Sequence, residues 1–106
     1  MTELSTVPEG EYLPEENTYR LRLFVTGASP NSTRAIINLK QICESHIKDN
    51  YEMEIVDVHQ QPLLAQSEQI VALPLLIKLS PGPQRRLIGD MSDTKKVLRG
   101  LDLSEL

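Results

Sequence analysis

The sequence predicts an α/β fold with the element order β-α-β-α-β-β-α. Three observations predict this fold. Short segments with alternating apolar residues, typical of strands, are interspersed with segments of helical periodicity. A long helical segment separates the first two strands, which makes them parallel. A Pro-Gly-Pro turn separates the last two strands, which indicates an antiparallel hairpin.

The first two strands are expected at residues 19–26 and 51–58. Apolar side chains alternate along residues 19–26, and Phe24 makes the far end apolar on both faces. This pattern is typical of a strand that enters the interior of a sheet.

The first helix is expected to run from Pro30 to about Lys48. Gly27 permits a sharp turn after the first strand, Ser29 can cap the helix, and Pro30 suits the first helical position, where a missing N–H costs nothing. The apolar residues of this segment form one stripe that includes Cys43, which predicts a small buried core residue at that position.

The second half of the chain is expected to contain a short helix at 62–71, a strand at 72–79 and a strand at 84–88. Because proline lacks a backbone N–H, Pro74 must lie at the start of its strand or at a sheet edge.

The last helix is expected at about residues 93–100, with Ser92 as its cap. Together, the elements form the minimal thioredoxin-like architecture. In that architecture the proline that opens the third strand is usually cis, so Pro74 is a structural cis-proline candidate.

Charge divides the chain into a predicted flexible acidic tail, residues 1–18, and a domain, residues 19–106. The tail has five Glu and neither Lys nor Arg, whereas the rest of the chain has 11 basic and 10 acidic residues. A near-neutral domain argues against nucleic acid as a partner. The sequence has no apolar run of membrane-spanning length and no secretory signal pattern, so we expect no membrane partner and a cytoplasmic protein.

The turn at residues 27–32 lacks the thiol that redox proteins of this architecture place at the helix N-terminus, where the helix dipole lowers a thiol pKa. Cys43, the only cysteine, lies several turns further along the helix. The two histidines, His46 and His59, suggest neither a metal site nor a base for a serine nucleophile. We therefore expect a non-enzymatic binding role with no cofactor and no metal; a monothiol redox enzyme is the alternative.

The adjacent Arg85 and Arg86 lie on a short strand that is expected at the sheet edge, where they should face opposite sides. With Lys78 of the paired strand they can form a small basic surface patch. The alternative is that these charges only prevent aggregation of sheet edges.

Several motifs, in order and with few gaps, resemble the KaiB family over roughly residues 19–103. They are Gly27-x-x-Pro30-Asn31-Ser32-x-Arg34-Ala35, Ile55-Val56-Asp57-Val58, Pro62-x-Leu64-Ala65, Pro74, Arg85-Arg86-Leu87-Ile88-Gly89-Asp90-Met91-Ser92-Asp93 and Lys96-Val97-Leu98-x-Gly100-Leu101-Asp102-Leu103.

The resemblance implies an adaptor that binds a KaiC-type hexameric ATPase and modulates its signalling in a circadian or related rhythmic process. Members of the family also compete with a sensor histidine kinase and sequester KaiA. They adopt a second, tetrameric fold in which the C-terminal half is rebuilt, so a dimer or tetramer is expected. The resemblance assigns partner binding to Arg34, Lys78, Arg85 and Arg86, and fold switching to Gly89, Gly100 and Asp102.

Three segments depart from the pattern of clock-type members. This chain has Leu73-Pro74-Leu75 in place of Thr-Pro-Thr, Glu54 in place of a lysine, with Glu52 beside it, and Gln69 in place of another lysine. Reversed charge at an interface opposes binding. These departures favour a divergent member, or one from a bacterium outside the clock lineage. The alternative function is a stress-response or two-component signalling adaptor that does not bind KaiC.

Overall fold

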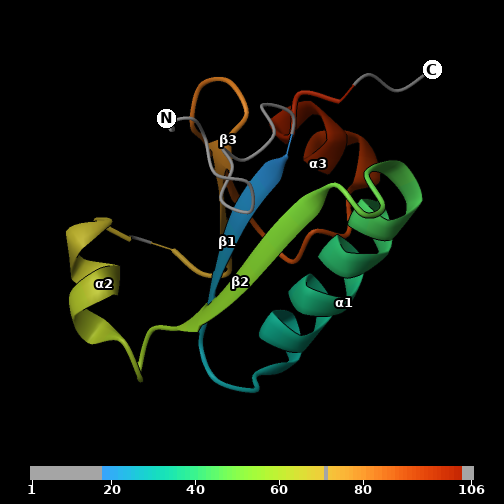
Figure 1. Cartoon of the computed structure of the whole chain (residues 1–106). Helices are drawn as coiled ribbons and strands as arrows, with labels where there is room; N and C mark the ends of the chain where they lie inside the picture. The colour runs from blue at the N-terminus through green and yellow to red at the C-terminus, as the bar shows by residue number, and fades with distance from the viewer. Residues whose placement is uncertain (1–17, 71, 104–106) are drawn as a thin grey trace, which may run out of the picture.

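The computed structural model describes residues 18–70 and 72–103. Apart from Thr18, the predicted acidic tail lies outside the described residues, as do the last three residues of the predicted domain. The described elements follow the predicted order (Figure 1). They are β1 (Tyr19–Val25), α1 (Pro30–His46), β2 (Tyr51–Asp57), α2 (Pro62–Ser67), β3 (Leu75–Ser80), β4 (Arg85–Ile88) and α3 (Thr94–Gly100).

The strands form one sheet in the order β2-β1-β3-β4. β1 pairs in parallel with β2 and antiparallel with β3, and β3 pairs antiparallel with β4. The predicted parallel pair and the predicted hairpin are thus both confirmed. β4 is an edge strand, as expected, whereas β3 lies inside the sheet.

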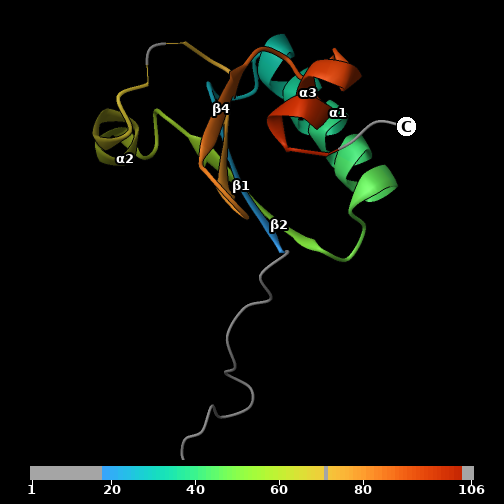
Figure 2. The ribbon, with the colours of Figure 1, turned by 90° about the horizontal axis from the view of Figure 1, so that it is seen from above.

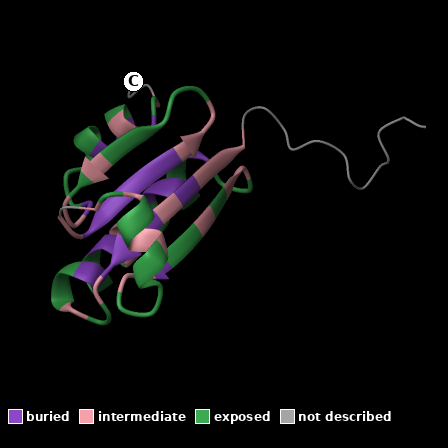
Figure 3. Cartoon of the chain, turned by 90° about the vertical axis from the view of Figure 1, so that its left-hand side faces the viewer, coloured by how far each residue is buried: buried purple, intermediate pink, exposed green. Residues whose placement is uncertain are grey.

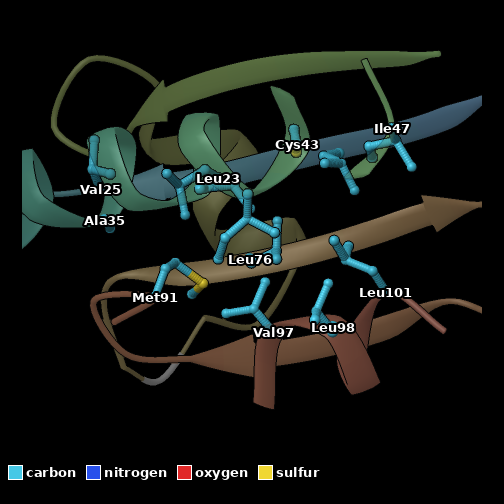
Figure 4. Close-up of a cluster of buried hydrophobic side chains, with 13 residues drawn as sticks. Leu23, Val25, Ala35, Cys43, Ile47, Leu76, Met91, Val97, Leu98 and Leu101 are labelled. Atoms are coloured by element: carbon cyan, nitrogen blue, oxygen red, sulfur yellow. The ribbon is translucent and has the colours of Figure 1, made fainter. Parts of the chain in front are cut away.

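The helices cover the sheet on both faces. α1 and α3 lie on one face and α2 on the other, which the view from above shows directly (Figure 2). Successive residues of β1 serve the two layers: Leu23 packs with the α1 and α3 side chains, and Phe24 packs in the cluster on the α2 side. Buried residues gather in the middle of the sheet (Figure 3). Figure 4 shows the larger cluster, between the sheet and helices α1 and α3.

Local signals place the start of α1 correctly and its end slightly too late. The Ser29 side chain accepts a hydrogen bond from the backbone N–H of Ser32, and Pro30 is the first helical residue, as predicted. The helix ends at His46, two residues before the predicted end. Asp49 adopts a left-handed conformation with φ of 64°, so the chain turns there toward β2.

The predictions for α2 and β3 need correction at their ends. α2 stops at Ser67, short of the predicted end at residue 71, and Gln69 is left-handed with φ of 56°. β3 starts at Leu75, three residues later than predicted. The preceding Leu73–Pro74 bond is cis. Pro74 has no backbone N–H to donate to a neighbouring strand. Its carbonyl accepts a hydrogen bond from the N–H of Gly89.

The prediction that Ser92 caps α3 is wrong. The carboxylate of Asp93 accepts a hydrogen bond from the backbone N–H of Lys96 and caps the helix. The backbone N–H of Ser92 donates instead to the carboxylate of Asp90. Among the described residues, no helix has both the length and the apolar character needed to cross a bilayer.

Candidate interaction site

The turn that precedes α1 is closed by hydroxyl groups. Ser32, which is buried, accepts a hydrogen bond on its Oγ from the backbone N–H of Thr26 and another from the Ser29 hydroxyl. The hydroxyls therefore serve the capping role expected of them. Cys43 is fully buried in the core, as predicted, and burial raises its pKa to about 12. Within residues 18–70 and 72–103, no three His, Cys, Asp or Glu side chains are placed to hold a metal ion.

The expectation that Lys78 lies on the surface is wrong, because its side chain is only 1% exposed. Lys78 belongs to the interior strand β3 and faces the α1 and α3 layer. Its ammonium lies 3.1 Å from the carboxylate of Asp102 and donates hydrogen bonds to the carbonyls of Pro81 and Pro83. A buried charge needs such partners, since burial without them is very costly. Lys78 is thus unavailable for contact with a partner in this fold.

Asp102, predicted to take part in fold switching, contacts two of the residues predicted to bind partners. Its carboxylate contacts Lys78 and also lies 3.0 Å from Nε of Arg85 on β4. Hydrogen bonds from Lys78 and Arg85 hold the pKa of Asp102 below its usual value. Asp102 has φ of 63° just beyond the end of α3. A Cβ at Gly100, in the same turn, would lie 3.3 Å from the Leu87 side chain of β4.

Because the pKa of Asp102 is lowered in the folded protein, we expect the free energy of unfolding to decrease as the pH becomes acidic. The contribution of Asp102 is present above the carboxyl's unfolded pKa of about 4 and is lost as pH falls through the lower folded value. Urea unfolding at a series of pH values should show that the free energy of unfolding falls more steeply with decreasing pH in the wild type than in Asp102→Asn. Equal slopes in the two proteins would contradict the lowered pKa.

Arg34 lies on the exposed side of α1 and faces the loop between β4 and α3. Its Nε is 3.3 Å from the Asp90 carboxylate, and the Asn38 amide donates to the backbone carbonyl of Asp90 at 3.0 Å. Hydrogen bonds from Ser92, and then from Arg34, lower the pKa of Asp90. Gly89 precedes this loop with φ of 131°, a conformation that side chains disfavour. Arg34 thereby ties α1 to the loop that leads into α3.

Arg86 points to the opposite face from Arg85, as the sequence predicted. Its Nη2 donates to the backbone carbonyl of Glu68 at 2.8 Å and to the Glu68 carboxylate at 3.0 Å. Nη1 of Arg22 lies 3.9 Å from the same carboxylate. The predicted surface patch of Lys78, Arg85 and Arg86 is therefore not formed, since Lys78 is buried and the two arginines lie on opposite faces. Sequence reasoning missed Glu68, because no local pattern links it to a strand 18 positions away.

The acidic residues that depart from the clock-type pattern are paired within the chain. β1 and β2 run in register, so Arg20 lies opposite Glu52 and Arg22 opposite Glu54. The corresponding ion pairs measure 3.7 and 2.9 Å. Leu73, a further departure, packs against the apolar cluster on the α2 side.

Comparison with known proteins identifies the family. The family model described as "KaiB domain" matches residues 22–103. The chain belongs to the KaiB family. It is 51% identical over 86 residues to the circadian clock oscillator protein KaiB of Prochlorococcus marinus subsp. pastoris, covering 81% of this chain and 80% of that protein. It is 49% identical over 87 residues to the circadian clock protein KaiB3 of Synechocystis sp., covering 82% and 85%. The resemblance seen in the motifs is confirmed.

Solved structures place this KaiB-family chain among thioredoxin-like folds, as predicted. The N-terminal domain of Synechococcus elongatus SasA superposes with a TM-score of 0.68 at 24% identity and covers 100% of this chain and 98% of that domain. Chloroplastic thioredoxin z superposes with a TM-score of 0.66 at 16% identity and covers 81% and 80%. At these identities the likeness is one of fold.

Proposed function

We propose that this protein is a non-enzymatic regulator in a circadian or related rhythmic process, and that it binds a KaiC-type hexameric ATPase and modulates its signalling. The observation that carries the proposal is the match to the KaiB domain over residues 22–103. Relatives that share about half of the aligned residues are named as circadian clock proteins. The hydroxyl-closed turn before α1 supports a binding role, since it offers no thiol for exchange.

Arg34, Arg85 and Arg86 are the basic residues that we propose for partner binding, because all three side chains are exposed. Each arginine forms an ion pair with an acidic side chain of its own chain. Its position is therefore fixed before an ATPase or a sensor histidine kinase binds. We propose no cofactor, a cytoplasmic location and a dimer or tetramer as the resting form.

We also propose that the C-terminal half of the chain adopts the family's second fold, with Gly89, Gly100 and Asp102 as the switching positions. Gly100 weakens the helix that contains it, and Asp102 occupies a left-handed conformation that non-glycine residues adopt at a cost. Two packings that differ by a few kcal/mol are enough for such a switch.

A second candidate function is a stress-response or two-component signalling adaptor that does not bind KaiC. The observation that favours it is the pair of carboxylates on β2, Glu52 and Glu54. Glu54 stands where clock-type members carry a lysine, with Glu52 beside it, and this negative charge opposes a partner suited to positive charge.

Size-exclusion chromatography with a KaiC-type ATPase tests the proposal directly. We expect co-elution after an incubation with ADP or ATP that is long enough for slow fold switching. Arg34→Ala should weaken it, whereas Lys40→Ala on the same helix is the matched control. Co-elution that never develops with either nucleotide would reject KaiC binding and favour the second function.

A further inference from the structure

α2 is the most lightly packed helix of the described structure. None of its six residues is buried, and Leu63 is 79% exposed. Leu64 within the helix and Ile70 beyond it pack only partly against the cluster beneath. A cavity of about 430 Å³ lies beside the helix, lined by Val58, Ala65, Gln66, Gln69, Ile70 and Leu73. Apolar contact alone therefore fixes α2 weakly on the sheet.

Polar contacts at the C-terminal end of α2 supply a second attachment. The guanidinium of Arg86, on β4, bonds both the backbone carbonyl and the side-chain carboxylate of Glu68, which directly follows the helix. Arg22 of β1 lies between the carboxylates of Glu68 and Glu54. The group thus connects the end of α2 to β4, β1 and β2. We call the two bonds from Arg86 to Glu68 the Arg86–Glu68 clamp.

We propose that Arg86 is a positioning residue that, through this clamp, holds α2 and the residues after it against the sheet. The inference rests on the proposed function in one respect: it assigns the contribution of Arg86 to partner binding to the placement of α2 rather than to contact between Arg86 and the partner. Both N–H groups of Arg86 Nη2 already bond acceptors of Glu68. An acidic partner that approached the rest of the guanidinium would meet the negative charge of the Glu68 carboxylate.

The two possible roles of Arg86 give opposite expectations for Glu68. If Arg86 contacts an acidic partner surface, removal of the Glu68 carboxylate removes a competing negative charge and strengthens binding. If Arg86 acts by positioning α2, Arg86→Ala removes both bonds of the clamp and Glu68→Ala removes its carboxylate bond, so both substitutions weaken binding. Glu68 therefore distinguishes positioning from direct contact.

Amide hydrogen exchange measures the clamp without any partner. The reporters are the backbone N–H groups of Glu68, Gln69 and Ile70, which follow α2 and donate hydrogen bonds to carbonyls within it. Because the clamp is charge-assisted but partly exposed, Arg86→Ala and Glu68→Ala should each speed their exchange roughly three- to tenfold. The double variant should exchange about as fast as Arg86→Ala, since Arg86→Ala already removes both bonds of the clamp and Glu68→Ala removes only the bond to the carboxylate.

Arg85→Ala is the matched control, because Arg85 is the neighbouring residue on β4 and pairs on the other face. It should leave exchange near α2 unchanged. Arg86→Lys keeps the charge but loses the planar guanidinium, so it should give an intermediate effect in a folded protein. Screening by 1 M NaCl should speed exchange in the wild type and leave Glu68→Ala unaffected. Wild-type rates in both single variants would overturn the positioning role.

Binding to a KaiC-type ATPase supplies the second measurement. Positioning predicts that Arg86→Ala weakens binding most and that Glu68→Ala and Arg86→Lys each weaken it by a smaller factor. Weaker binding for Arg86→Ala with unchanged or stronger binding for Glu68→Ala would establish direct contact and overturn the inference. A wild type that never binds the ATPase would reject the proposed function alone, because hydrogen exchange still decides whether the clamp holds α2.

Discussion

Lys78→Ala is expected to lower the free energy of unfolding by about 3 kcal/mol, the cost typical of deleting a large buried side chain. The Lys78 stem is enclosed between the sheet and the α1 and α3 layer, and its ammonium bonds two carbonyls of the loop after β3. Truncation leaves a cavity and removes the link to Asp102. Urea unfolding followed by circular dichroism measures the loss.

Lys78→Met separates the contribution of the stem from that of the charge. Methionine fills nearly the same volume, and the carboxylate of Asp102 keeps its contact with Arg85. Replacement of a buried charge by an apolar side chain of similar size often costs little, so we expect a loss of about 1 kcal/mol or less. A loss as large as that of Lys78→Ala would show that the ammonium, rather than packing, stabilises this site.

Cys43 in the native protein is expected to react with iodoacetamide at pH 8 at least about a thousandfold more slowly than in the unfolded chain. Two effects combine: the side chain has no exposed surface, and burial raises the thiol pKa to about 12, so thiolate is scarce. Labelling must therefore wait for the core to open. Mass spectrometry of timed samples, with and without urea, gives both rates.

Labelling of the native protein at the unfolded rate would revive the hypothesis of a monothiol redox enzyme. That hypothesis also predicts turnover of a disulfide substrate that stops in Cys43→Ser. A protein that resists labelling and shows no such turnover fits a role limited to recognition.

Features set by local chemistry could be predicted from the sequence. The alternation of apolar residues located β1, and Phe24 correctly indicated burial on both faces. The Ser29 cap and Pro30 follow from backbone geometry at a helix start. The opposite directions of Arg85 and Arg86 follow from the pleat of a strand.

Features set by distant contacts could not be predicted in this way. A lysine on a short strand is expected at the surface. Lys78 is buried because the order of strands places β3 inside the sheet, where Asp102 lies next to its ammonium. The contact between Arg86 and Glu68 likewise depends on where α2 ends. Ser92 and Asp93 are both good cap residues, and only in the folded structure is it seen that the Asp93 carboxylate accepts the Lys96 N–H.

The two arginines of β4 give this short strand an influence beyond its length. Arg85 contacts Asp102, two residues after α3, and Arg86 contacts Glu68, the residue that follows α2. The C-terminal ends of α3 and α2, on opposite faces of the sheet, are therefore both bonded to one edge strand of four residues. A change in the pairing of β4 would act on both helix ends at once.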